Sequence, residues 1–330
     1  MSMAYWLALH AGVSALATWL ALAYARHRNL VDLPGERRSH AVATPRGGGI
    51  GIACALLVGS LALSVSGEGA LARVGGFAVG LALVAGIGWF DDHRPLSPWS
   101  RLLVQCLAGM VLAWGLHGIE GRWGWALLTV ALVPVLVNVW NFMDGIDGLA
   151  TSQALIAAAA FAWLALAVAV PALALVAACA GFLPFNFPRA RIFLGDVGSG
   201  TLGFALAALV ALAAPGMGLP GAMLLLLPLS AFLVDASLTL ASRVAAGERW
   251  WQPHVRHAYQ RWVRAGRSHT YVTGVYATFS IASLILAGFL QGKGPWAAGG
   301  GVLAWLAVAA LAWVFLCRCL PPGKESREET

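Results

Sequence analysis

Residues 149–186 read LATSQALIAAAAFAWLALAVAVPALALVAACAGFLPFN and decide the topology of the chain. No charged residue lies between Asp147 and Arg189. One helix over this stretch would be about 55 Å long, nearly twice the roughly 30 Å hydrocarbon thickness of a bilayer. We therefore expect two membrane-spanning helices here, joined by a tight turn near residues 169–171.

The rest of the chain has the same apolar character. Apolar residues make up 60% of the 330 residues and charged residues 11%, whereas soluble domains carry about 25% charged residues. A soluble enzyme, a disordered chain and a disulfide-stapled secreted module are excluded. The expected fold is an all-α polytopic membrane domain over residues 1–330. Its eleven predicted spans are residues 4–25, 48–66, 71–90, 98–117, 122–138, 149–169, 172–186, 197–214, 220–242, 271–290 and 297–317.

The positive charges gather on one side of these spans. With edge residues included, 18 of the 21 Lys and Arg residues fall in the loops of that side. The positive-inside rule makes it cytoplasmic, with the N-terminus outside and a short cytoplasmic tail at 318–330. Merging the two helices of 149–186 would destroy this asymmetry. The Lys and Arg residues of these loops account for the net charge of +7, and no nucleic-acid partner is expected.

Unusual polar residues also concentrate on this side. The first loop, DLPGERRSHAVATPRGGG (residues 32–49), contains Thr44 and Arg46 before three glycines. Arginine can bind phosphate with two parallel hydrogen bonds, and glycine lets a backbone approach a ligand closely. An ordinary positively charged loop would have the same composition, so this loop alone does not indicate function.

Carboxylates stand at two predicted membrane edges. Asp91 and Asp92 are adjacent at the end of the third span, where they repel each other unless they share a proton or a cation. Asp196 begins the eighth span within FNFPRARIFLGDVGSG (residues 185–200). A carboxylate there can cap the helix or bind Mg²⁺, and the sequence leaves both alternatives open.

Four acceptor-rich side chains recur every third residue in NVWNFMDGIDGLA (residues 138–150): Asn138, Asn141, Asp144 and Asp147. Because three residues turn a straight α-helix back by about 60°, they would spread over half its circumference. A 3₁₀ or broken segment would align them, and the glycine after each aspartate permits one. Such side chains beside apolar spans are costly unless they are used.

The last polar group lies in WWQPHVRHAYQRWVRAGRSH (residues 250–269), where His254, Arg256 and His257 stand between aromatic residues. Two histidines with an arginine favour phosphate over zinc, and a segment lying on anionic headgroups is the alternative. Asp235 lies deeper in a span, either as a functional acid or as a structural partner of another span. Carboxylates, Arg and His at one membrane edge indicate Mg²⁺-dependent phosphoryl transfer between a water-soluble and a lipid substrate.

The chain resembles the polyprenyl-phosphate N-acetylhexosamine-1-phosphate transferases of glycosyltransferase family 4. The resemblance is carried by three stretches in this order, FDD, NVWNFMDGIDGLA and FNFPRARIFLGDVGSG, together with the first loop and HVRH. The resemblance implies transfer of a sugar 1-phosphate from a UDP-N-acetylaminosugar to polyprenyl (undecaprenyl) phosphate, with release of UMP. It implies Mg²⁺ as cofactor, with Mn²⁺ as a substitute, and a multi-pass protein of the bacterial cytoplasmic (inner) membrane whose active site faces the cytoplasm. A homodimer is left open.

The resemblance also implies roles for individual residues. Asp91 and Asp92 would be catalytic, Asp196 would hold the metal, and Phe193 would stack on uracil. The remaining residues would contact substrate: Thr44, Arg46, Asn138, Asn141, Asp144, Asp147, Asn186, His254, Arg256 and His257. Arg256 stands where the peptidoglycan branch has a histidine, so the chain looks like the branch that initiates O-antigen.

Other functions are left open by the sequence. A peptidoglycan-type or teichoic-acid-type transferase of the same family is one. A transporter or lipid flippase would need polar residues through the bilayer midplane, where Asp235 is the one charged candidate. A non-catalytic scaffold would tolerate loss of Asp91 and Asp196. The donor sugar, the choice between direct attack and a covalent aspartyl intermediate, and the role of Asp235 are undecided by the sequence.

Overall fold

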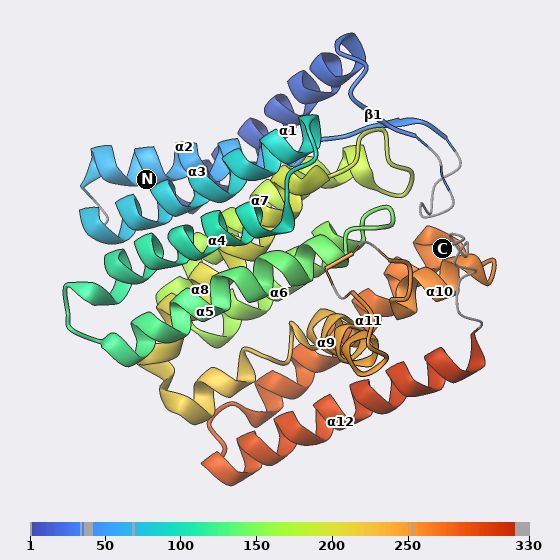
Figure 1. Ribbon diagram of the computed structural model, residues 1–330. Coiled ribbons are helices and arrows are strands. Elements are labelled where there is room, and N and C mark those ends of the chain that lie inside the picture. The colour runs from blue at the N-terminus through green and yellow to red at the C-terminus, as the bar shows by residue number, and fades with distance from the viewer. Residues whose placement is uncertain are drawn as a thin grey trace.

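The chain forms a bundle of helices with one short two-stranded ribbon in the computed structural model, which describes residues 2–33, 35, 42–67, 70–249, 251–252 and 254–320 (Figure 1). The elements are α1 (Met3–His27), β1 (Val31–Asp32), β2 (Thr44–Pro45), α2 (Ile50–Ser66), α3 (Leu71–His93), α4 (Pro98–Ala113), η1 (Trp114–Gly118), α5 (Trp123–Phe142), α6 (Leu149–Leu164), η2 (Leu166–Val168), α7 (Ala169–Asn186), α8 (Gly195–Leu224), α9 (Ser230–Ala245), α10 (Ala258–Arg264), α11 (His269–Leu290) and α12 (Pro295–Cys319).

The all-α membrane fold expected from composition is confirmed. Among the described residues, eight helical segments are long and apolar enough to cross a membrane, and α2 and α6 are shorter apolar helices. The expected hairpin over 149–186 is present as α6 and α7, which pack against each other. Its turn lies at 165–168, slightly earlier than predicted, so that Pro171 falls in the first turn of α7, where its missing N–H costs no helical hydrogen bond.

One predicted span is wrong. Residues 220–242 do not form a single helix, because α8 continues to Leu224 and α9 begins after a turn at 225–229. Pro228 explains the stop, since a proline ring clashes with the carbonyl four residues earlier, here that of Leu224. The α8 helix is also broken at Gly218, whose φ is 67°. The consequence is a short α9 that carries Asp235.

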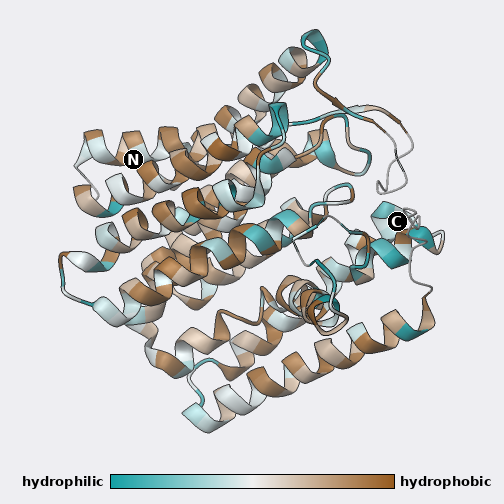
Figure 2. Ribbon diagram, viewed as in Figure 1, coloured by the Kyte–Doolittle hydropathy of each residue, from teal (hydrophilic) through white to brown (hydrophobic). Residues whose placement is uncertain are grey.

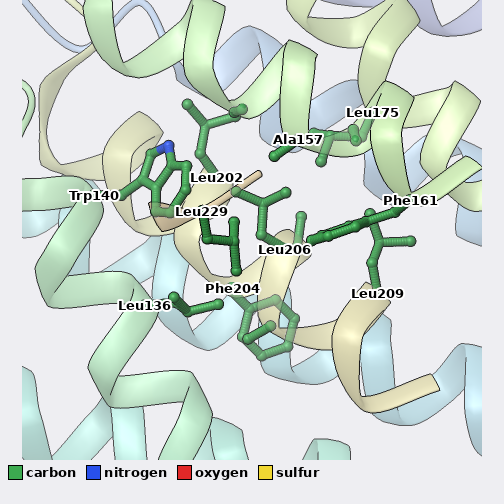
Figure 3. Packing of buried hydrophobic residues seen from close by; sticks show 14 of the residues in the cluster. Leu136, Trp140, Ala157, Phe161, Leu175, Leu202, Phe204, Leu206, Leu209 and Leu229 are labelled. Carbon is green, nitrogen blue, oxygen red and sulfur yellow. The ribbon is translucent and has the colours of Figure 1, made fainter. Parts of the chain in front are cut away.

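Helix α8 is the centre of the bundle. Every residue from 197 to 211 is buried, and the helix packs against α3, α5 and α6. Figure 3 shows Leu202 and Leu206 of α8 among side chains of α5, α6 and α7. Lipid tails are as apolar as leucine, so helices in membranes associate mainly through close packing, which the small residues of α8 allow.

The polar connections gather at one end of the bundle. In Figure 1 the β1–β2 ribbon, the loop between α5 and α6, the segment after α7 and helix α10 lie at the same end, and Figure 2 colours many of the residues there as hydrophilic. This is the side predicted to be cytoplasmic, and that orientation stays a prediction. The tail predicted from residue 318 continues past residue 320, outside the described residues.

Candidate active site

Asp92 ties the end of α3 to the start of α8. Its Oδ1 accepts the backbone N–H of Asp196 at 3.0 Å and its Oδ2 that of Val197 at 3.1 Å. These N–H groups lie in the first turn of α8, where they have no partner within the helix. Gly195 makes this approach possible, because its φ is 75° and a Cβ there would lie 2.6 Å from Asp92 Oδ2. By accepting these two N–H groups, the Asp92 carboxylate caps α8. The Asp92 side chain is buried, with 2% of its surface exposed.

Asp91 and Asp196 share one cationic group. Arg101 Nη1, from α4, lies 2.7 Å from Asp91 Oδ2 and 2.9 Å from Asp196 Oδ2. Asp91 Oδ1 also accepts the N–H of Leu96 at 2.6 Å. The capping alternative for Asp196 is wrong, because α8 has no side-chain cap bond at its N-terminus and Asp92 takes that role. The Asp196 side chain is therefore turned to Arg101 and not to its own helix.

Two asparagines of α5 line the same place. Asn141 Nδ2 donates to Asp196 Oδ1 at 2.5 Å and to Ser199 Oγ at 3.2 Å. One turn earlier, Asn138 Nδ2 donates to Gln105 Oε1 at 2.7 Å. A small pocket between α3, α4, α5 and α8 is lined on its polar side by these side chains: Arg101, Gln105, Asn138, Asn141 and Asp196. We call Asp91, Asp92, Arg101, Asn141 and Asp196 the acid centre.

The acid centre offers oxygen ligands but no complete metal cage. Among the described residues, no group of three or more His, Cys, Asp or Glu side chains is arranged to hold a metal ion. A guanidinium nevertheless sits between Asp91 and Asp196, so this pair accepts a positive charge. A site with two carboxylates, an amide and a hydroxyl suits a hard cation that keeps water and phosphate as its other ligands.

The first loop packs against the segment before α8. Phe193 N donates to the Pro45 carbonyl at 2.7 Å, and Gly48 N donates to the Phe193 carbonyl at 2.9 Å. A Cβ on Gly49 would lie 2.2 Å from Gly198 Cα. The glycines expected to approach a ligand are therefore used, at 48 and 49, for contact between segments of the chain. The stacking of Phe193 on uracil stays a prediction.

Two candidate residues of the first loop have protein partners. Thr44 is buried and its hydroxyl donates to the Val42 carbonyl at 3.0 Å. Arg46 Nη2 donates to the backbone carbonyl of Asp92, while its buried Nε has no hydrogen-bond partner within the described residues. Arg46 thus lies beside the acid centre, with a donor left for a further group.

The sequence 138–150 is broken as the spacing indicated. α5 ends at Phe142, and α6 begins at Leu149, so that Asn138 and Asn141 are helical while Asp144 and Asp147 lie in the loop. Burial of the Asp144 carboxyl, helped by the charges of Asp92 and Asp147, raises its pKa to about 8. One of the two charges that raise this pKa, that of Asp92, belongs to the acid centre.

Asp147 and Asn186 join this loop to its neighbours. Asp147 Oδ2 lies 3.3 Å from His269 Nδ1, at the start of α11, and Thr273 donates to the Asp147 carbonyl at 3.0 Å. Asn186 is buried; its Oδ1 accepts Gly148 N at 3.0 Å and its Nδ2 donates to Ile192 O at 3.1 Å. Both ends of that amide are used within the protein, and contact with substrate stays a prediction.

The histidine segment, residues 254–257, approaches the acid centre through the end of α5. The His257 ring stacks on Phe142 at 6.2 Å between centroids, and Phe142 follows Asn141 directly. Burial of the imidazole, followed by the positive charges of His257, Arg243 and Arg256, lowers the pKa of His254 to about 3. Its Nδ1 accepts the N–H of Arg256 at 3.3 Å, which leaves the proton of the neutral ring on Nε2.

Arg256 is bonded to an acid that the sequence did not single out. Its Nη1 donates to Glu248 Oε1, and Glu248 Oε2 lies 3.0 Å from Arg243 Nε. Arg101 and His269 were likewise not among the candidate residues. Their roles depend on helix packing between distant parts of the chain, and the signal available in the sequence was their position at a predicted membrane edge.

Comparison with known proteins places the chain among lipid-linked sugar transferases. A family model described as glycosyl transferase family 4 matches residues 74–214, which include Asp91, Asp92 and Asp196. The chain is 33% identical over 285 residues to decaprenyl-phosphate N-acetylglucosaminephosphotransferase of Mycobacterium tuberculosis, covering 72% of this chain and 70% of that protein. It is 29% identical over 280 residues to the probable undecaprenyl-phosphate N-acetylglucosaminyl 1-phosphate transferase of Bacillus subtilis, covering 78% and 77%.

Similarity to the peptidoglycan enzymes is shorter. The chain is 37% identical over 145 residues to phospho-N-acetylmuramoyl-pentapeptide-transferase of Limosilactobacillus fermentum, covering 37% of this chain and 45% of that protein. The N-acetylglucosamine enzymes align over about twice that share of the chain. This difference agrees with the branch that Arg256 indicates.

Proposed function

The chain belongs to glycosyl transferase family 4, and from this premise we propose that it transfers an N-acetylaminosugar 1-phosphate from a UDP-sugar to a polyprenyl phosphate. The observation that supports this most is the acid centre, where Asp91 and Asp196 jointly accept the positive charge of Arg101. A diphosphate carries charge that a protein must neutralise, and a cation held by carboxylates does so. The relatives from Mycobacterium tuberculosis and Bacillus subtilis are named for N-acetylglucosamine, so UDP-N-acetylglucosamine is the first donor to test.

We propose Mg²⁺ as the cofactor of this transfer, with Mn²⁺ as a substitute. Asp196 and Asp91 would supply carboxylate oxygens, and Asn141 or Ser199 a neutral oxygen, after Arg101 moves aside. Mg²⁺ commonly binds one or two carboxylates together with substrate phosphates and water, so a larger carboxylate cage is not required. Bound there, the ion would neutralise developing charge on the diphosphate.

The reaction we propose is direct attack. An oxygen of the polyprenyl phosphate bonds to the β-phosphorus of the UDP-sugar, and the bond between that phosphorus and the bridging oxygen breaks. UMP leaves with the bridging oxygen. Both oxygens of Asp92 accept backbone N–H groups, and both of Asp91 accept Leu96 N–H or Arg101. Oxygens held in this way favour positioning over nucleophilic attack, which argues against an aspartyl intermediate.

The remaining residues would bind the two substrates. Arg256 and His257 would meet the diphosphate across the end of α5, and Arg46 would meet a phosphate near Asp92. The acceptor tail would lie in the membrane beside the bundle, with the chemistry at its cytoplasmic edge. We assign the product to the first membrane step of O-antigen or related envelope polysaccharide synthesis, in the bacterial inner membrane.

The test is a reconstituted assay. Purified protein in detergent receives undecaprenyl phosphate and a panel of UDP-N-acetylaminosugars, and UMP release and the mass of the lipid product are measured. We expect one donor to give polyprenyl-diphospho-sugar, EDTA to stop the reaction, and added Mg²⁺ to restore it. No UMP from any donor would contradict the proposal. Movement of a donor across proteoliposomes without UMP would favour a transporter, and complementation by an Asp91→Asn/Asp196→Asn variant would favour a scaffold.

A further inference from the structure

Asp235 is a buried acid in an apolar helix. It lies in α9 and is 3% exposed, yet both of its oxygens are satisfied. Oδ1 accepts Ala258 N at 3.0 Å, Thr239 Oγ1 at 3.1 Å and Trp313 Nε1 at 3.2 Å. Oδ2 accepts the hydroxyl of Tyr276 at 2.7 Å. The donors come from α9 to α12, and such hydrogen bonding stabilises the charged form of a carboxyl group.

Besides these four neutral donors, one imidazole ring, that of His257, faces the Asp235 carboxylate. His257 Nδ1 lies 3.4 Å from Asp235 Oδ1, and the His257 side chain is 3% exposed. Nδ1 makes no hydrogen bond of ordinary geometry within the described residues, although the His257 side chain also faces the backbone N–H of Gln260 in the capping box of α10. Asp235 is the acid that Nδ1 faces. Long contacts of this kind are common in sites without substrate and shorten when substrate binds.

The plane of the His257 ring is fixed by its neighbours. Tyr259 stacks at 5.8 Å with an interplanar angle of 17°, Phe142 at 6.2 Å with 26°, and His254 lies at 4.8 Å. With the plane fixed and Nδ1 turned to Asp235, Nε2 is the nitrogen left for another partner. A carboxylate beside one ring nitrogen holds the orientation of an imidazole, so that the other nitrogen is presented to a ligand.

We propose that Asp235 is a positioning residue, which orients His257 so that its Nε2 side faces a phosphate of the donor. The inference rests on the proposed function, because it assigns a role to a residue within that active site. It also answers why an intramembrane acid is present. A purely structural carboxylate would be satisfied by its four donors, whereas the contact with His257 links it to the segment beside the acid centre.

A double-mutant cycle separates a positioning role of Asp235 from a purely structural one. A residue that acts through His257 loses its effect on activity when His257 is replaced. The variants are Asp235→Asn, which keeps size but removes charge, His257→Gln, and both together. We expect Asp235→Asn to lower kcat/KM about 10-fold to 100-fold, as loss of a carboxylate behind a functional histidine commonly does. In the His257→Gln background the same change should cost less than about twofold.

Tyr276→Phe is the matched control, since it removes a donor to the same carboxylate but leaves the charge facing His257. We expect it to lower kcat/KM less than about fivefold, with the same factor in both backgrounds, as for one neutral hydrogen bond. Thermal unfolding and size-exclusion profiles verify that each variant is folded. If Asp235→Asn does not fold, Asp235→Glu, which keeps the charge and shifts its position, takes its place in the cycle.

Failures of the two proposals are distinguishable. A wild-type protein that releases no UMP from any UDP-sugar contradicts the proposed function itself. An active wild-type protein in which the Asp235 variant costs as much with His257→Gln as without it overturns the positioning role and leaves Asp235 as a tie between helices. A fully active Asp235→Asn variant overturns it as well.

Discussion

The acid centre and the histidine segment are held in different ways. In the acid centre, Asp92 is bonded to two backbone N–H groups at the start of α8, whose residues from 197 to 211 are all buried. In the histidine segment, His257 depends on side chains around it and on one buried carboxylate behind it. Main-chain contacts survive most substitutions of their partners, whereas side-chain contacts do not. The acid centre is therefore built for fixed geometry, and the histidine segment for adjustable charge.

The largest effect is expected from Asp196→Asn, which tests the chemistry of the acid centre without disturbing its frame. The substitution keeps the backbone N–H that Asp92 accepts but removes one negative charge from the pair that holds a cation. We expect turnover to fall by at least about 1,000-fold, as for loss of a key electrostatic group, with thermal stability nearly unchanged. UMP release and thermal unfolding measure the two quantities.

Glu120→Gln is the control for that prediction. Glu120 is an exposed acid that pairs with Arg73 and Arg122 at the other end of the bundle, so that losing its charge should leave turnover unchanged. Near-normal turnover of Asp196→Asn would contradict the metal assignment. An unfolded Asp196→Asn variant would contradict the view that the backbone fixes this region.

A smaller effect with a defined direction is expected from Arg101→Gln. Arg101 is ion-paired with the carboxylates of Asp91 and Asp196, so the proposed Mg²⁺ would have to displace it. Hydrogen bonds between charged groups contribute about 1.5–3 kcal/mol, and removing this competitor should lower the half-saturating Mg²⁺ concentration about tenfold. A titration of UMP release against Mg²⁺ measures it. A higher half-saturating concentration would mean that Arg101 assists the metal rather than competing with it.

Much of the acid centre could be predicted because span counting places helix ends on one side. Asp91, Asp92 and Asn141 follow from the ends of two apolar stretches and Asp196 from the start of another, so their meeting is a consequence of topology. The break after residue 142 followed from the spacing of four polar residues and two glycines. These features are local, and local spacing is what a single sequence displays.

The rest depends on packing between distant residues. Asp235 meets Ala258, Tyr276 and Trp313, which lie 23, 41 and 78 residues later, and nothing in the sequence pairs them. The span predicted over 220–242 was wrong because hydropathy does not register that Pro228 removes a hydrogen bond and clashes with Leu224. The sequence left the role of the loop glycines open, because the contact of Gly49 with α8 is visible only in three dimensions.

Glu248→Gln, a change in the partner of Arg256, tests whether charge is adjustable in the histidine segment. Glu248 pairs with Arg256, and both side chains are about a quarter exposed, so the pair is worth roughly 0.2–1 kcal/mol. Without the carboxylate, more of the charge of Arg256 is available to a diphosphate, and we expect the KM for the donor to fall up to about fivefold. Steady-state kinetics measure it. A higher KM would show instead that Glu248 holds Arg256 in place.

The smallest effect concerns pH. Burial and then the charges of His257, Arg243 and Arg256 lower the pKa of folded His254 to about 3, against 6.5 ordinarily. Between these values the unfolded chain binds a proton that the folded chain does not, so the folded state loses stability as pH falls below about 6.5. We expect the thermal midpoint to fall less in His254→Gln than in wild type between about pH 7.5 and about pH 5.5. His27→Gln, at an exposed position in α1, is the control and should follow wild type. Equal pH dependence in all three proteins would contradict a neutral His254 ring in the folded chain, and with it the view that charge in the histidine segment is adjustable.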